Sequence, residues 1–289
     1  MSVLKMMSRF ASTSDNTALM DIPEEKEEEE TELYNFASDP LTQFSCAFSA
    51  LVHDVLHPGV PNAQLMKEDP EAGKHYKYKS VAEQRSFDIA WELLMENKFD
   101  RLRHAIYQTR AEESKFRQLV VNSVMATDVF DPDLKKLRND RWQKAFGETH
   151  RNSGDRRTSV DRQATIVIEH LIQASDVSHT MQHWNVYRKW NQRLFEEMYQ
   201  AYLDGRSEKD PSEFWYMGEI GFFDHYVIPL AKKLDECGVF GVSSHEYLDF
   251  ALKNRKEWEV KGKNIVETMT VACLRAGEKR QTVLIEGIP

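Results

Sequence analysis

Three groups able to bind a metal ion or transfer a proton lie within five residues of this sequence. His53 and Asp54 are adjacent, and His57 follows just before Pro58 and Gly59. An imidazole nitrogen beside a carboxylate suits a divalent cation of borderline hardness, and the carboxylate can also bridge to a harder cation such as Mg²⁺ or Mn²⁺. The same pair at a helix end can instead be a cap that compensates the helix dipole. The local pattern leaves both interpretations open.

The segment before His53 has the periodicity of a helix. Four apolar residues recur along it at intervals of three and four: Phe44, Ala47, Phe48 and Leu51. This spacing places them on one face, which we expect to lie in the core. The helix would then carry His53 and Asp54 near its C-terminal end, and Pro58 with Gly59 would end the regular backbone.

A second acidic candidate lies far along the chain. Residues 163–178 are predicted to be helical, with Val167, Leu171 and Ala174 on one face, and Asp176 comes at the end of this mostly apolar segment. A carboxylate is costly to bury there unless it is paired, capped or bound to a metal. Asp176 is therefore a candidate to join His53 and Asp54.

Composition favours one large all-helical domain. The 289 residues include fifteen Phe, ten Tyr and six Trp, which is more aromatic surface than a disordered chain carries. Of the net charge of −9, residues 21–32 contribute −7 (eight acidic residues and one lysine), which leaves −2 for the rest. A nearly neutral body gives no indication of nucleic-acid binding.

Cysteine usage and hydropathy indicate an intracellular, cytoplasmic chain. The three cysteines, Cys46, Cys237 and Cys273, are odd in number and have no C-x-x-C spacing, which fits a reducing compartment. The sequence contains no run of 18 apolar residues, so we expect no membrane span within this chain. We expect a helix and acidic linker at 1–32, one domain at 33–276 and a loose tail at 277–289.

Further helices follow from periodicity and caps. We expect a helix after Ser80, with Glu83 in a capping box. Other helices are expected at 113–129, 184–203, 213–234 with a kink at Pro229, and 244–272, and a loop is expected at 138–162. In the helix at 184–203 the residues in register are Val186, Trp190, Leu194 and Met198.

Several motifs together resemble the class I 3′,5′-cyclic nucleotide phosphodiesterases. HDVLHPGVPN at 53–62 resembles their H-D-V-D-H-P-G-x-x-N signature, and ASDVS at 174–178 resembles their A-D-L-S segment. Tyr187, Arg188 and Trp190 match Y-R-x-W, and Gly221-Phe222 lies where their Q-V-G-F sits. The resemblance covers roughly residues 1–272, and the order and spacing of the motifs make it specific.

This resemblance implies a compact all-α catalytic domain of the HD type. The domain would hydrolyse cyclic AMP or cyclic GMP to the 5′-monophosphate in signal transduction, using two divalent metal ions. It implies that His53, Asp54 and Asp176 bind zinc, and that Asp54 also bridges to magnesium or manganese. Two cations a few Å apart activate water and absorb charge on the attacked phosphate.

The resemblance also implies roles for residues around the metals. Asp54 and His57 would be catalytic, and three residues would hold waters around the metals: Glu83, Thr127 and Asp128. Phe222 would stack on the purine. The residues assigned to the substrate pocket are Glu219, Phe222, His179, Tyr187 and Leu194.

The sequence departs from the family pattern at three places, and the first two favour an alternative function. The family takes its general acid and a further zinc ligand from an H-N-x-x-H motif that lies upstream of the first residue of this sequence. Upstream domains are also where we expect any membrane association to come from. Leu56 stands where the family has Asp, and Glu219 stands where it has the purine-selective Gln. An ionised Glu only accepts hydrogen bonds, which favours guanine over adenine. The alternative is a catalytically impaired homologue that binds cyclic nucleotides and regulates signalling.

Overall fold

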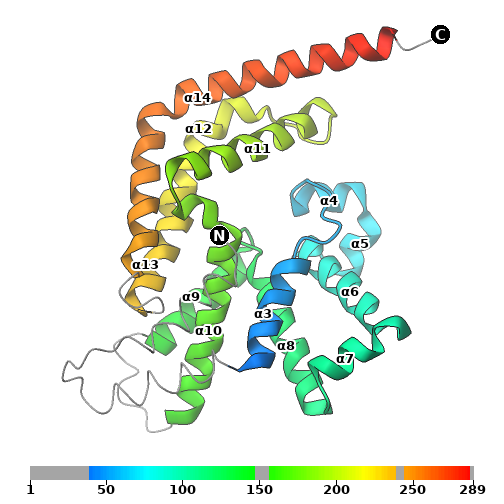
Figure 1. Ribbon diagram of the computed structural model, residues 1–289. Helices are drawn as coiled ribbons and strands as arrows, with labels where there is room; N and C mark the ends of the chain where they lie inside the picture. The colour runs from blue at the N-terminus through cyan, green and yellow to red at the C-terminus, as the bar shows by residue number, and fades with distance from the viewer. Residues whose placement is uncertain (1–38, 147–155, 239–243, 287–289) are drawn as a thin grey trace.

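The computed structural model describes residues 39–146, 156–238 and 244–286, which form helices and turns with no β-strand among them (Figure 1). The all-α class predicted from the sequence is confirmed. The helix and acidic linker expected at 1–32 lie outside the described ranges. Within those ranges, no helix has both the length and the apolar character needed to cross a membrane.

The helices form two groups joined by a middle pair. The first group consists of α3 (Pro40–Val52), α4 (Asn62–Glu68), α5 (Pro70–His75), α6 (Val81–Met95), η2 (Asn97–Phe99), α7 (Asp100–Ile106) and α8 (Arg110–Ala126). The middle pair is α9 (Pro132–Phe146) and α10 (Arg156–Asp176). The second group consists of η4 (Ser178–Met181), α11 (Trp184–Leu203), α12 (Pro211–Phe222), η5 (Phe223–Val227), α13 (Ile228–Glu236) and α14 (Ser244–Glu286).

Each group has its own hydrophobic core. In the first group, Phe116 of α8 is fully buried and packs against Phe87 and Ala90 of α6. In the second, Phe195 of α11 and Trp258 of α14 are fully buried in one large cluster. Figure 1 shows α10 between the two groups, where it contacts α3 and α8 on one side and α13 on the other.

The buried side of α3 is only in part the one predicted, since Phe44 and Phe48 pack against Phe116 of α8 while Leu51 faces solvent. Leu51 is 80% exposed and Phe44 is 38% exposed. The buried residues are instead small or polar: Thr42, Ser45, Cys46, Ser49 and Val52. The hydroxyls of Ser45 and Ser49 donate to the carbonyl oxygens four residues earlier, at 2.6 and 2.7 Å, so burying them leaves no unpaired polar group. Their small size lets α3 lie close to α10, where Cys46 packs against Ile168 and Ile172.

Helix α11 has the predicted bounds but a rotated buried face. Trp190 and Leu194 are 49% and 46% exposed. The buried stripe lies one residue further on and comprises Tyr187, Asn191, Phe195 and Tyr199. Three aromatic rings bury more apolar area than the predicted set, and Asn191 is paired because its Oδ1 accepts from Trp215 Nε1 at 3.4 Å.

Two segments predicted to be irregular are helical. The loop expected at 138–162 is helix at 138–146, because Arg138, Trp142 and Ala145 form a buried stripe at helical spacing, and α10 already begins at Arg156. The loose tail expected from 277 onward is wrong as far as Glu286, where α14 ends. Gly277 alone does not stop this helix, since the residues that follow it are mostly good helix formers.

The predicted break near Pro229 is present as a π-helical turn. The turn, η5, occupies Phe223–Val227, and α13 starts immediately after it with Pro229 in its first turn. Proline has no N–H to donate and its ring crowds the carbonyl four residues earlier, so the preceding turn widens.

Candidate active site

His53, Asp54 and Asp176 come together where two helices end. His53 is the C-cap of α3, Asp54 follows it, and Asp176 is the last residue of α10. One ligand atom from each of the three lies within 4.8 Å of the other two. Because helix C-termini carry partial negative charge, both helix ends favour a cation at this point.

The imidazole of His53 is oriented as a metal ligand would be. Its Nδ1 lies 3.1 Å from the carbonyl oxygen of Ala50, which fixes the proton on Nδ1 in the neutral ring. Its Nε2 is buried and makes no hydrogen bond among the described residues. Nevertheless, Nε2 lies 3.0 Å from Oδ2 of Asp54 and 3.4 Å from Oδ1 of Asp176. A lone pair facing two carboxylates requires a positive charge between them.

The electrostatics of the trio agree with this requirement. Burial lowers the pKa of His53, but its contacts with Asp176 and Asp54 outweigh burial and raise the pKa to about 10. The contact with His53 in turn holds the pKa of Asp54 below its usual range. The three residues therefore fit a divalent cation in place of the imidazole proton. Zinc accepts such a mixed nitrogen and oxygen set.

The turn after Asp54 contains the predicted residues Leu56 and His57. Leu56 has φ 56° and is 69% exposed, so its side chain points into solvent and not into the core. His57 is also exposed, and its Nδ1 accepts a hydrogen bond from the N–H of Gly59 at 3.2 Å. In that geometry the proton of the neutral ring is on Nε2. Gly59 has φ 72°, and Arg206 anchors the turn by donating to the carbonyl oxygen of Pro58 at 3.1 Å.

Glu83 does not form the predicted capping box with Ser80. Ser80 has a left-handed backbone and no capping hydrogen bond from its side chain. Asn62 replaces it, because its Oδ1 accepts from the N–H of Ala82 at 2.8 Å while its Nδ2 donates to Oε2 of Glu83 at 3.0 Å. Burial raises the pKa of Glu83, against the hydrogen bond from Asn62 and the charge of His57.

Thr127 and Asp128 lie at the C-terminal end of α8, and each has a structural partner. The hydroxyl of Thr127 donates to the carbonyl oxygen of Val124 at 2.7 Å. Oδ1 of the buried Asp128 accepts from the N–H groups of Phe130 and Asp131 at 3.1 and 3.0 Å. The charge of Asp128 contributes to the raised pKa of Glu83, so the two carboxylates face a shared region.

In the second group of helices, Glu219 of α12 is held by α11. Its Oε2 accepts a 2.7 Å hydrogen bond from the hydroxyl of Tyr187. Burial raises the pKa of Glu219 to about 7, and the hydrogen bonds from Tyr187 and Asn191 oppose that rise. Tyr187 itself is fully buried between aromatic rings. It therefore positions Glu219 and has no exposed surface of its own in this structure.

Phe222 lies one turn after Glu219 and stacks on Tyr226, with ring centroids 5.3 Å apart and an interplanar angle of 21°. The hydroxyl of Tyr226 is buried and has no hydrogen-bond partner among the described residues. Burial raises the pKa of Tyr226, and the charge of Asp176 adds to the rise. Tyr226 thus connects the Phe222 side of the site to the metal ligands.

His179 and Leu194 complete the predicted set. The ring of His179 lies 6.4 Å from that of Trp190, and burial lowers the pKa of His179 to about 4. Leu194 is 46% exposed one turn along from Trp190. Both residues are placed to line a surface next to α11.

The structure thus brings the three predicted ligands into contact and Glu83 into contact with Asn62. Two residues without a predicted role, Asn62 and Tyr226, emerge from the structure. Nothing in the sequence placed Asn62 at the start of α6, because the two segments meet only through the fold. The stacking of Tyr226 on Phe222 could have been predicted from their spacing of four residues on a helix.

Comparison with known proteins matches this site to one family. The family described as 3′5′-cyclic nucleotide phosphodiesterase matches residues 26–239. "Probable 3′,5′-cyclic-AMP phosphodiesterase pde-4" of Caenorhabditis elegans is 28% identical over 203 residues, 66% of this chain and 29% of the relative. "3′,5′-cyclic-AMP phosphodiesterase 4C" of Mus musculus is 24% identical over 234 residues, 75% of this chain and 32% of the relative. The chain therefore spans about a third of the length of these relatives.

Solved structures share the fold. The phosphodiesterase domain of the RhoPDE fusion protein from the choanoflagellate Salpingoeca rosetta aligns with a TM-score of 0.61 at 20% identity, over 83% of this chain and 77% of that one. A second structure of the phosphodiesterase domain of the rhodopsin phosphodiesterase from the same organism gives a TM-score of 0.62 at 19% identity, over 84% and 75% of the two chains.

Proposed function

Because this chain belongs to the 3′,5′-cyclic nucleotide phosphodiesterase family, we propose that it hydrolyses a 3′,5′-cyclic nucleotide to the 5′-monophosphate with the help of divalent cations. The observation that carries the proposal is the convergence of His53, Asp54 and Asp176, with ligand atoms within 4.8 Å of one another around an unpartnered Nε2. When bound, divalent cations supply Lewis-acid activation of water and offset the charge of the phosphate.

In this proposal, His53 and Asp176 hold a first cation, for which zinc fits the ligands. Asp54 has a side chain that is 63% exposed, and only its Oδ2 faces His53. Its other oxygen is therefore available to bridge to a second, harder cation such as Mg²⁺ or Mn²⁺. The carbonyl oxygen of Ala50 keeps the ring of His53 in the ligating tautomer.

The roles of the surrounding residues follow from their partners. Asn62 fixes the carboxylate of Glu83, which can accept a hydrogen bond from water. His57 offers its Nε2–H as a proton donor next to these carboxylates. Phe222, stacked on Tyr226, offers an apolar face to a purine, and Glu219 can bind the edge of the base.

The test is product formation by the purified chain. We expect 5′-monophosphate from cyclic AMP or cyclic GMP in the presence of Zn²⁺ with Mg²⁺ or Mn²⁺, measured by chromatography, and none after chelation. Asp176→Asn should lower the rate by at least about 100-fold, since even groups that only orient metal ligands are commonly worth 10–100-fold. Asp133→Asn, which makes the same charge change at an exposed ion pair with Lys79, should leave the rate within about twofold.

A second candidate is binding without turnover. It is favoured by Leu56, whose apolar side chain points into solvent at a position where the resemblance leads one to expect Asp. Calorimetry that detects cyclic nucleotide binding by a metal-loaded chain that makes no product would support this candidate. A chain that neither binds nor hydrolyses either nucleotide would contradict both.

A further inference from the structure

A cavity of about 690 Å³ lies between the start of α11 and the middle of α14, lined by residues that have no part in the proposed reaction. Its lining includes Trp184, Arg188, Lys261, Asn264, Ile265 and Thr268. Its volume is in the range of small-molecule sites. Cations and hydrogen-bond donors predominate among the polar groups of this set.

Arg188 is the central group because its charge has no anionic partner among the residues that the structure describes. The guanidinium carbon lies 5.9 Å from the ring centroid of Trp184. Its Nη1 is buried and has no hydrogen-bond partner within the described ranges. Burial lowers the pKa of Arg188. Arg188 also lines the cavity, where an anion would pair with the charge of its guanidinium.

Lys261 brings a second positive charge to the same aromatic ring. Its Nζ lies 5.7 Å from the centroid of Trp184. It forms an ion pair with Glu257 one turn earlier on α14, and an ammonium group has three donors, so two remain for a ligand. Two cations beside one ring repel each other, and an anion that binds both relieves the repulsion.

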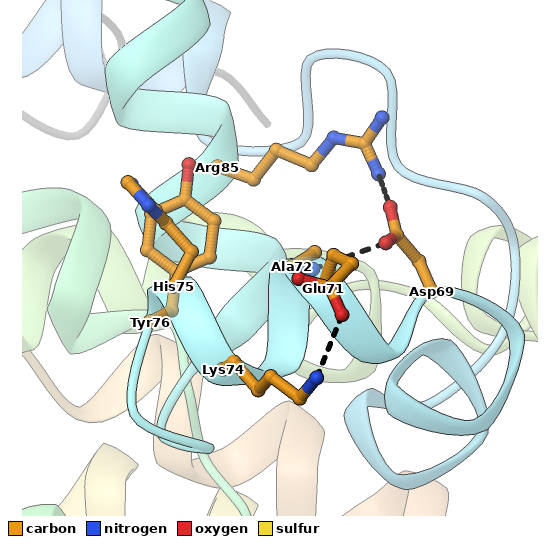
Figure 2. Close-up of a pocket in the computed structure, with 7 residues that line it drawn as sticks. All are labelled: Asp69, Glu71, Ala72, Lys74, His75, Tyr76 and Arg85. Atoms are coloured by element: carbon orange, nitrogen blue, oxygen red, sulfur yellow. Dashed lines mark hydrogen bonds and ion pairs between the residues drawn. The ribbon is translucent and has the colours of Figure 1, made fainter.

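Another cavity in the described part of the chain differs in how its charges are paired. It has a volume of about 680 Å³ and is lined by α5 with Arg85 (Figure 2). Its charges pair with each other, since Lys74 lies 2.7 Å from Glu71 and Arg85 lies 3.6 Å from Asp69. Figure 2 shows the Lys74–Glu71 and Arg85–Asp69 pairs as dashed lines among the lining residues, so these charges already have partners.

We propose that the cavity at Trp184 binds the phosphate group of a small phosphate monoester. A phosphate offers three strong acceptor oxygens, whereas a carboxylate offers two. The guanidinium of Arg188, the ammonium of Lys261 and the amide of Asn264 together provide more N–H donors than a carboxylate can satisfy. Ile265 adds an apolar wall for the group that carries the phosphate. This site is separate from the proposed metal centre and does not depend on the proposed hydrolysis.

The test uses phenyl phosphate and benzoate, which carry the same ring on different anions. Metal is first stripped and dialysed away so that the metal centre cannot hold phosphate, and binding is measured by calorimetry. Arg188→Met keeps an unbranched stem on Trp184 and should weaken phenyl phosphate binding about tenfold or more, because charge-assisted hydrogen bonds are lost. Lys261→Met should have an effect of similar size.

Matched controls separate this cavity from general surface charge. Arg193 lies over Trp190 on α11, and Lys263 lies over Tyr216 from α14. Arg193→Met and Lys263→Met remove the same charges elsewhere and should change affinity less than twofold. Should Arg188→Met fail to fold, Lys261→Met decides the question. The proposal is overturned by no binding to the wild-type chain, by equal losses in all the Met variants, or by benzoate binding as tightly as phenyl phosphate.

Discussion

Glu219 shows how burial changes the hydrogen-bonding ability of a single side chain. An ionised Glu can only accept, but burial raises the pKa of this carboxyl to about 7. Below pH 7 the protonated form both donates and accepts, as an amide does, and it can pair with the donor and acceptor edge of adenine. Above pH 7 the ionised form accepts from the two N–H groups of guanine.

We therefore expect nucleotide preference to depend on pH. The ratio of kcat/KM for cyclic AMP to that for cyclic GMP should fall severalfold as pH rises from 6 to 8, because the donor on Glu219 is lost. In Glu219→Gln, whose amide does not titrate, the ratio should be flat over the same range. Parallel slopes in the two proteins would show that another group titrates.

Asn62 connects a helix start to a carboxylate of the site. It accepts from the N–H of Ala82 and donates to Glu83. Asn62→Ala should lower the free energy of unfolding by about 1–2 kcal/mol, as loss of a cap does, and should slow turnover because Glu83 loses its orientation. Urea denaturation and initial rates measure the two effects.

Asn122 provides the control for Asn62. It accepts an exposed hydrogen bond from Gln118 one turn earlier in α8. Asn122→Ala should cost less than about 0.5 kcal/mol, in line with other surface substitutions, and leave the rate unchanged. Equal stability of Asn62→Ala and wild type would exclude the capping role.

At the scale of elements, the packing of α14 on α12 requires glycine at position 262. A Cβ built there would lie 2.8 Å from Cδ2 of Tyr216 and 2.9 Å from Cε2 of the buried Trp258. Gly262→Ala should destabilise the fold by about 1–3 kcal/mol through overpacking, despite a gain of about 1 kcal/mol in helix propensity. Gly277 on the same helix has only Leu203 at 3.9 Å, so Gly277→Ala should stabilise by up to about 1 kcal/mol. Thermal denaturation of both variants tests this opposite sign.

The elements also show where sequence reasoning succeeds and where it fails. Helix α11 was predicted with its observed bounds because the segment is strongly periodic and Gly205 follows it. Its buried face was missed by one residue, since apolar spacing did not reveal that Asn191 would find Trp215 as a partner. In α3, the buried stripe of Ser45 and Ser49 depends on hydroxyls that bond to their own helix, which a hydrophobicity pattern does not register.

In the candidate site too, local features were predicted from the sequence, whereas contacts between distant segments were predicted only in part. The pairing of His53 with Asp54 is local, and the sequence showed it directly. The approach of Asp176 was expected because a carboxylate at the end of an apolar helix needs a partner, and the resemblance named that partner. The role of Asn62 could not be found this way, because its contact with Ala82 joins the first turns of α4 and α6, which meet only through the packing of these two helices.

At the scale of the whole molecule, the metal ligands come from both sides of the junction between helix groups. His53 and Asp54 follow α3 in the first group, and Asp176 ends α10, which also packs against α13 in the second. The two groups have separate cores. A cation held by all three residues would therefore link the C-terminal end of α3 to that of α10. This link would add to the apolar contact of Cys46 with Ile168 and Ile172.

This arrangement predicts that metal binding stabilises the whole fold. A ligand present at 100 times its Kd, and bound only by the folded state, stabilises by about 2.7 kcal/mol. In a chain of this size that corresponds to a rise in Tm of about 5–10 °C. Scanning fluorimetry with and without Zn²⁺ or Mn²⁺ should show this rise, and chelation should reverse it. In Asp176→Asn the rise should largely disappear and the metal-free Tm should fall, since the imidazolium of His53 loses one of the two carboxylates beside Nε2. A variant that gains as much from the metal as wild type would show that the cation binds elsewhere, and that the junction at α3 and α10 is held without it.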